Sequence, residues 1–113
     1  MILMILKIIA AIGTIATGLV SLIRPGAVTG FTGLSVTGPR GVTEIRAVLG
    51  ALFVALGAAP LLLNVPATYQ MLGIAYLVVG LVRFVSMIID KSVEQSNVIS
   101  LIVEVIFGVV LVL

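Results

Sequence analysis

Apolar residues fill four long runs of this chain, and polar residues gather between the runs. The runs extend over about residues 2–23, 42–63, 67–89 and 98–113. A helix needs roughly 20 residues (range about 17–25) to cross the hydrocarbon core of a bilayer. Three runs meet that length comfortably and the last is short. The pattern therefore predicts four membrane-spanning helices.

Proline and glycine mark the ends of these runs. "RPG" follows the first run, "TGPRG" precedes the second, and "NVP" separates the second from the third. Proline cannot continue a helix but suits its first turn, and glycine tolerates the turn conformation after a helix end. Short connections place consecutive helices antiparallel. We expect an all-α fold, an up-down-up-down four-helix bundle with residues 1–113 in a single transmembrane domain.

The longest connection, loop 24–41, is rich in glycine and threonine, with Phe31 and Leu34 as its bulky apolar residues. This composition is typical of an Ω-loop or of a segment that rests on lipid headgroups. It contains neither G-x-G-x-x-G nor a glycine followed by Lys-Ser/Thr, so it does not match a nucleotide-binding loop. A plain connector is favoured over a ligand loop, and the role of loop 25–41 stays open.

Small and polar residues recur at steps of three and four along each run, which predicts one inward face per helix. Lipid is as apolar as leucine, so membrane helices associate through close packing at small residues and through hydrogen bonds. The seven-residue glycine spacings in the second and third runs predict a close crossing of those two helices at about +20°. The predicted helix-packing glycines are Gly18, Gly50, Gly57, Gly73, Gly80 and Gly108.

Composition supports a membrane location and narrows the chemistry. The chain has 113 residues, of which 62% are hydrophobic and 9% charged, whereas about a quarter of a soluble domain is charged. The formal net charge is +2 and the sequence has no cluster of basic residues, so it does not indicate a surface that binds nucleic acid. The absence of cysteine and histidine excludes disulfides, thiol nucleophiles and the usual zinc sets. We expect no catalytic, cofactor or metal site and no enzyme activity.

Four charged residues fall inside the apolar runs: Glu44, Arg46, Arg83 and Glu104. Arg83 and Glu104 each lie about seven residues inside their helix ends, about 10 Å below the same surface. Arg46 lies near that level, and Glu44 is one turn shallower. An unpaired charge at the bilayer centre costs about 2.5–3.5 kcal/mol, so we predict a neutral network with Glu104 between the two arginines. Glu44 either joins this network or caps its own helix.

The intramembrane charge network has two interpretations. A structural network would fix helix register, a role attested for buried polar groups. A functional site would exchange a proton for a cation at the glutamate, or hold an anion at an arginine. The four charges sum to zero, which favours the structural role. Tyr76 is a further candidate member, Tyr69 is expected at the outer interface, and Lys7 is expected to extend outward to the headgroups.

The sequence resembles a known family in three places. These are "EIRAVLGALFVALG" at 44–57, "GLVRFVSMIID" at 80–90, and the lone glutamate of the last run, Glu104. Together they are similar to the small bacterial membrane proteins grouped as domain of unknown function family 4345. The resemblance covers nearly the whole chain and implies four transmembrane helices without an established activity.

Small multidrug-resistance transporters have the same length, but their essential glutamate lies in a first helix that here contains no acid. DoxX-like proteins are also four-helix membrane proteins, but no motif selects them.

These observations predict a small non-catalytic integral membrane protein, either an oligomer or an accessory, structural subunit of a membrane complex. The alternative is a small dimeric proton-coupled or anion-handling transporter that uses Glu104 and Arg83. A membrane enzyme ranks below both. The expected partners are the lipid bilayer and either copies of the chain or larger membrane subunits.

The expected location is the bacterial inner (plasma) membrane. Lysine and arginine concentrate in the loops after the first and third runs, as is typical of cytoplasmic loops, which places both termini outside. The first run lacks a preceding basic region and a convincing cleavage site, so we expect a spanning helix there rather than a signal peptide.

Overall fold

The computed structural model describes residues 1–113 and consists of helices and their connections. Four continuous helices are long and apolar enough to cross a membrane, in agreement with the all-α prediction. They are α1 (Ile2–Ile23), the helix Pro39–Leu63, α5 (Pro66–Ile89) and α6 (Gln95–Val112). The helix Pro39–Leu63 comprises α3 (Pro39–Glu44), a π-helical segment (Ile45–Leu52) and α4 (Phe53–Leu63).

Local sequence sets where the second and third spanning helices begin and end. Gly38 has a φ of 90°, which glycine adopts without strain, and Pro39 then occupies the first turn of α3. The helix therefore begins three residues earlier than the apolar run predicts. Asn64 adopts the left-handed conformation after α4, and Pro66 starts α5 two residues later. This tight turn reverses the chain.

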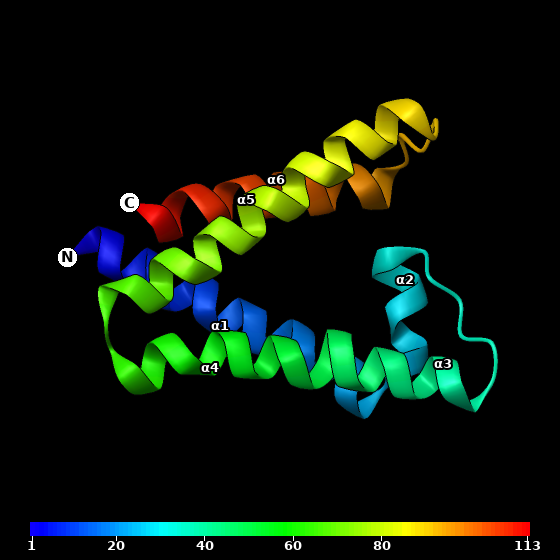
Figure 1. Cartoon of the computed structure of the whole chain (residues 1–113), viewed down its shortest axis with the longest axis horizontal. Helices are drawn as coiled ribbons and strands as arrows, with labels where there is room; N and C mark the ends of the chain where they lie inside the picture. Colours follow the sequence, from blue (N-terminus) through cyan, green and yellow to red (C-terminus); the bar gives the residue numbers. More distant parts are fainter.

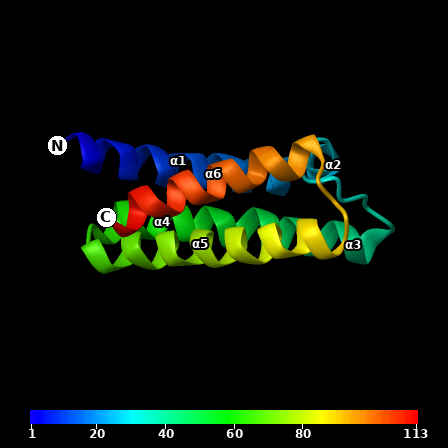
Figure 2. The same ribbon diagram turned by 90° about the horizontal axis from the view of Figure 1, so that it is seen from above.

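The four spanning helices alternate in direction and form two antiparallel pairs (Figures 1 and 2). α1 packs along the π-helical segment and α4, and α5 packs along α6. The pairs lie close together at the end that holds both termini and diverge toward the other end (Figure 1). The molecule is a flattened wedge with principal extents of 43 × 31 × 17 Å.

The apolar core lies at the narrow end of this wedge. Its buried members come from α1, α5 and α6, and they are Ala10, Ala11, Tyr69, Leu72 and Leu111. Elsewhere most apolar side chains are exposed, and at most 22% of each apolar span is buried within the chain. This exposed apolar surface suits contact with lipid, and only a small part of each helix contacts other helices.

Glycines hold the first pair close together. A Cβ atom added at Gly57 would lie 2.6 Å from the carbonyl oxygen of Ala11, and one at Gly18 would lie 2.7 Å from the carbonyl oxygen of Gly50. Real Cβ atoms do not approach backbone atoms so closely, so only glycine permits this separation of α1 from the helix Pro39–Leu63. Gly50 in turn contacts the backbone of Leu22, where a Cβ would lie 3.0 Å away.

Glycines serve the second pair in the same way. A Cβ at Gly73 would lie 2.8 Å from the Cβ of Leu111, and one at Gly108 would lie 2.6 Å from the side chain of Leu77. The predicted close crossing between the second and third helices is therefore wrong: their glycines face α1 and α6 instead. Because the pairs diverge after the turn at Asn64, α4 and α5 separate before most of their glycines could meet.

Loop 24–41 folds back against the bundle. A short 3₁₀ turn (Pro25–Ala27) leads into α2 (Val28–Thr32), which ends at Gly33 with a φ of 77°. Val28 is fully buried, and α2 contacts α6 across the wide end of the wedge (Figure 1). The chain then extends to Gly38 and enters α3. The glycine-rich connection thus contributes a wall between the two helix pairs.

Candidate intramembrane charge site

Arg83 of α5 and Glu104 of α6 form a bidentate ion pair. The Nε–H of Arg83 donates to Oε1 of Glu104 over 2.7 Å, and an Nη2–H donates to Oε2 over 2.9 Å. This two-pronged geometry matches the planar guanidinium to the planar carboxylate and is the strong form of such a pair. The side chains are 29% and 10% exposed. A Cβ atom added at Gly80 would lie 3.5 Å from the Cβ of Glu104. The ion pair therefore lies where this glycine of α5 leaves space.

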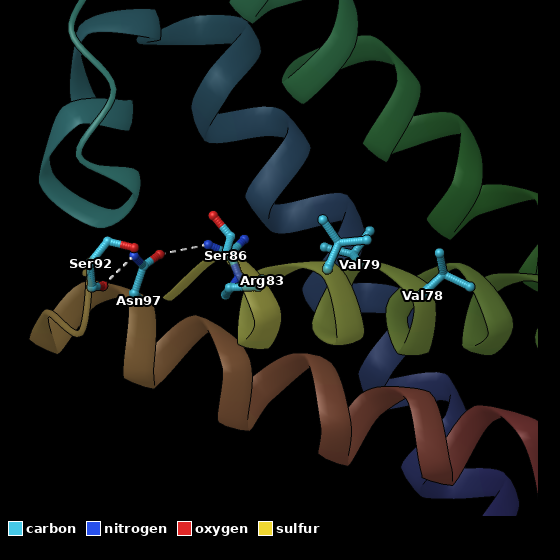
Figure 3. A pocket seen from close by; sticks show the side chains of 7 residues that line it. Val78, Val79, Arg83, Ser86, Ser92 and Asn97 are labelled. Atoms are coloured by element: carbon cyan, nitrogen blue, oxygen red, sulfur yellow. Dashed lines mark hydrogen bonds between the residues drawn. The ribbon is translucent and has the colours of Figure 1, made fainter. Parts of the chain in front are cut away.

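Asn97 completes this network, which we call the Arg83–Glu104–Asn97 network. An Nη1–H of Arg83 donates to the side-chain oxygen of Asn97 over 2.9 Å, and the Asn97 amide donates to the carbonyl oxygen of Ser92 over 2.8 Å. Figure 3 shows Asn97 between these two partners. The network therefore ties both helices to their connecting loop. Asn97 was not among the residues predicted for the charge network, although it lies seven residues before Glu104 and therefore on the same helix face.

Glu44 and Arg46 lie outside this network, so the predicted four-residue cluster does not form. Glu44 pairs with Arg40 one turn earlier, through side chains that are 53% and 80% exposed. Arg46 is exposed and has no carboxylate within ion-pair distance. The π-helical segment begins at Ile45, and its i→i+5 bonds change the angle between successive residues. The α-helical spacing that predicted an inward Arg46 therefore does not hold there. Glu44 also forms no capping hydrogen bond.

Tyr76 connects the two helix pairs at the inner end of the site. Its hydroxyl lies 2.5 Å from the hydroxyl of Thr14 on α1. The Thr14 hydroxyl has a single proton and donates it to the carbonyl oxygen of Ala10 over 2.8 Å. Tyr76 must therefore donate to Thr14. Its ring meets Phe107 edge to face, with centroids 5.5 Å apart at 88°.

A cavity of about 510 Å³ lies between the diverging helix pairs. All four spanning helices and α2 contribute to its walls, and both Arg83 and Glu104 line it. Its polar lining residues include Thr17, Thr32, Tyr76, Arg83, Ser100 and Glu104, and Phe31, Phe53 and Phe107 line its apolar part.

A second hollow of about 400 Å³ lies on the other side of Arg83, beside Ser86, Ser92 and Asn97 (Figure 3). Val78, Val79 and Val82 form the rest of its lining. Arg83 therefore lines both the central cavity and this outer hollow.

Lys7 was expected to extend outward to the headgroups; the structure buries most of its side chain, and its Nζ is not fully enclosed. Lys7 is only 9% exposed, and it makes no ion pair or side-chain hydrogen bond within the chain. It precedes the buried Ala10 and Ala11 by three and four residues, and therefore lies on the inward face of α1. Tyr69, which was expected at the interface, is buried in the core of the narrow end.

Four apolar spanning helices with an ion pair set inside them define a multi-pass α-helical membrane protein. Residues 2–113 match the sequence profile of a family described as a domain of unknown function, DUF4345, and the chain belongs to this family. No curated protein and no solved structure matches the chain.

Proposed function

We propose that this chain is a non-catalytic membrane protein that assembles with copies of itself or with larger membrane subunits. The Arg83–Glu104–Asn97 network holds α6 against α5 and so maintains the shape of the assembling unit. The observation that carries this proposal is the completeness of the pair: each carboxylate oxygen of Glu104 accepts a hydrogen bond from Arg83. A neutral, internally bonded pair leaves no uncompensated charge for coupling to an ion.

The use of the other polar side chains supports a non-catalytic role. Thr14, Thr17 and Ser21 each donate their hydroxyl proton to the carbonyl oxygen four residues earlier on α1. A hydroxyl bonded in this way has its donor satisfied within its own helix, and such small polar residues favour close packing of helices in membranes. The large apolar outer surface supports assembly, because it is available to lipid and to other membrane helices alike.

The proposed location is the bacterial inner membrane, with both termini outside. Loop 24–41 and the loop between α5 and α6 lie at the same end of the molecule (Figure 1). These two loops carry Arg24, Arg40 and Lys91. The excess of basic residues in cytoplasmic loops supports placing this end in the cytoplasm.

A second candidate function is proton-coupled or anion-handling transport through Glu104 and Arg83. One observation favours it: both side chains line the central cavity and are not sealed between helices. In this alternative, Glu104 would release Arg83 when it takes up a proton. The two candidates differ in whether the chain supports a proton-driven flux that depends on Glu104.

A charge-exchange experiment tests both candidates. Arg83→Glu and Glu104→Arg are expected to lower the free energy of unfolding by about 3 kcal/mol each, near the lower end for breaking a buried pair, because Arg83 keeps partial exposure. The doubly exchanged chain is expected to recover most of this loss in thermal unfolding followed by circular dichroism. Exchanging Arg40 with Glu44 is the matched control, and its exposed pair is expected to change little.

Measuring proton-driven flux into proteoliposomes together with stability separates the two candidate functions. The assembly proposal predicts recovered stability and no proton-driven flux in any form of the chain. A proton-driven flux in the unmodified chain that vanishes in a folded Glu104→Gln variant would replace it with the transport proposal.

A further inference from the structure

The central cavity has the size and composition of a small-molecule site. Its volume of about 510 Å³ falls within the range of roughly 300–1,000 Å³ that ligand pockets occupy. Such pockets combine mostly apolar walls with a few convergent polar groups. Here the cavity lies where the two helix pairs diverge, with α2 at its wide end.

The hydroxyl groups around the cavity mainly offer lone pairs. Thr17 donates its proton to the carbonyl oxygen of Gly13 over 3.0 Å, and Thr32 donates to the carbonyl oxygen of Val28 over 2.7 Å. Tyr76 donates to Thr14 as described above. Each hydroxyl has only one proton, so these oxygens can accept but not donate toward a ligand.

The charged pair adds further acceptors, together with the unused N–H donors of Arg83, without net charge. Each carboxylate oxygen of Glu104 accepts one hydrogen bond from Arg83, which leaves lone pairs free. Arg83 uses three of its five N–H groups on Glu104 and Asn97. The pair as a whole is neutral, so it gives neither an anion nor a cation a strong electrostatic advantage.

Ser100 is the exception among the lining hydroxyls. It is half-buried on α6 and makes no hydrogen bond within the chain, so its proton is free. No side-chain polar atom in the chain is both fully buried and without a partner, so the Ser100 oxygen is accessible. A group that both donates and accepts would satisfy Ser100 and the neighbouring acceptors together.

Aromatic rings form part of the apolar lining of the cavity. Phe31 comes from α2, Phe53 from α4 and Phe107 from α6. Phe107 is fixed in place by its edge-to-face contact with Tyr76. A ligand in this cavity therefore meets both polar and apolar side chains.

We propose that the central cavity binds an uncharged amphiphilic alcohol. Its hydroxyl donates to one of the lining acceptors Tyr76, Thr17 and Glu104, and its apolar part contacts Phe53 and Phe107. A membrane-resident alcohol such as a diacylglycerol and a water-soluble alcohol share this chemistry. This site is independent of the assembly role, because it depends on the cavity and not on the outer surface.

The test uses the full chain in phosphatidylcholine nanodiscs and a photoreactive octanol that carries a diazirine. Irradiation followed by peptide mass spectrometry is expected to place the label on the segments that line the cavity. Octanol is expected to compete roughly tenfold better than octyl methyl ether, which has the same apolar chain but no donor; one net hydrogen bond supplies about that factor. Equal competition by the ether, or stronger competition by octanoate, would overturn the proposal.

Competition also identifies the source of the ligand. Displacement of the label by dioleoylglycerol in the nanodisc supports a membrane-resident alcohol, and displacement by benzyl alcohol added from water supports a soluble one. If unlabelled octanol, dioleoylglycerol and benzyl alcohol all leave the labelling unchanged, the proposal fails.

A cavity-filling variant provides the matched structural test. Ser100→Leu extends bulk into the cavity and removes no protein hydrogen bond, so labelling is expected to fall at least fivefold. Ser96→Leu, one turn away on the same helix and outside the lining, is expected to retain it. Equal labelling of both variants would place the alcohol elsewhere. The competition series on the unmodified chain stays decisive if Ser100→Leu fails to fold.

Discussion

At the scale of single residues, the charges of this membrane protein differ in how completely they are paired. Arg83 and Glu104 satisfy one another through two hydrogen bonds, and Asn97 accepts a third from Arg83. Arg40 and Glu44 pair near the exposed end of their helix, where pairing contributes little. Arg46 has no partner in the chain, and its exposure leaves it free to reach headgroups. Of the two ion pairs, the less exposed one, Arg83 with Glu104, is therefore also the one with more hydrogen bonds.

Asn97 is expected to stabilise the network in a measurable way. Asn97→Ala removes the acceptor for one Arg83 N–H and the donor to the carbonyl oxygen of Ser92. We expect the free energy of unfolding to fall by about 1 kcal/mol, with a lower Tm in circular dichroism. Ser96→Ala, the neighbouring residue without a hydrogen bond, is the control. Identical Tm values for the two variants would show that the Asn97 contacts do not contribute.

At the scale of helices, glycine decides how closely each pair can approach. Gly18 and Gly57 bring α1 against the helix Pro39–Leu63, and Gly73 and Gly108 bring α5 against α6. The π-helical segment contains Gly50, so the first pair is held together across a change in helical winding. These contacts are made inside each pair, which lets the two pairs diverge and open the central cavity.

The glycines differ in how much they tolerate substitution. Gly57→Ala would place a Cβ 2.6 Å from the carbonyl oxygen of Ala11, so the two helices must separate. We expect a loss of about 1–3 kcal/mol, the usual result of overpacking. Gly80→Ala is the matched control, because its Cβ would meet Glu104 at an ordinary 3.5 Å. Thermal unfolding that ranks Gly80→Ala as the more damaging change would contradict this view of the packing.

The sequence predicts the positions of the helices more accurately than it predicts which helices contact one another. Apolar runs and membrane thickness predict four spans, and equal depth predicts the meeting of Arg83 with Glu104. The depth of a residue does not specify the angle at which its side chain projects from the helix axis. The predicted cluster with Arg46 and the predicted crossing of the second and third helices were therefore wrong. The π-helical segment has no proline or other local signal in Ile45–Leu52, and it shifts the spacing on which the Arg46 prediction depended. Lys7 shows the same limit: helix periodicity placed its neighbours inward, but its charge suggested the opposite.

At the scale of the whole molecule, the structure is a wedge with a packed end and a divergent end. Core residues join three helices near the termini, while the cavity, α2 and the charge network occupy the other end. Most of the outer surface is apolar along the full length of the spans. Long apolar helix faces are therefore exposed, and the Arg83–Glu104–Asn97 network joins α5 to α6.

The most direct test of the proposed assembly role is the native mass of the chain after gentle extraction from its own membrane. The proposal predicts a mass above that of the 11.7 kDa chain, from added copies or larger subunits. It further predicts dissociation on Arg83→Glu or Glu104→Arg alone and recovery when both charges are exchanged. A single chain of 11.7 kDa with bound lipid only, unchanged by any of these substitutions, would contradict it.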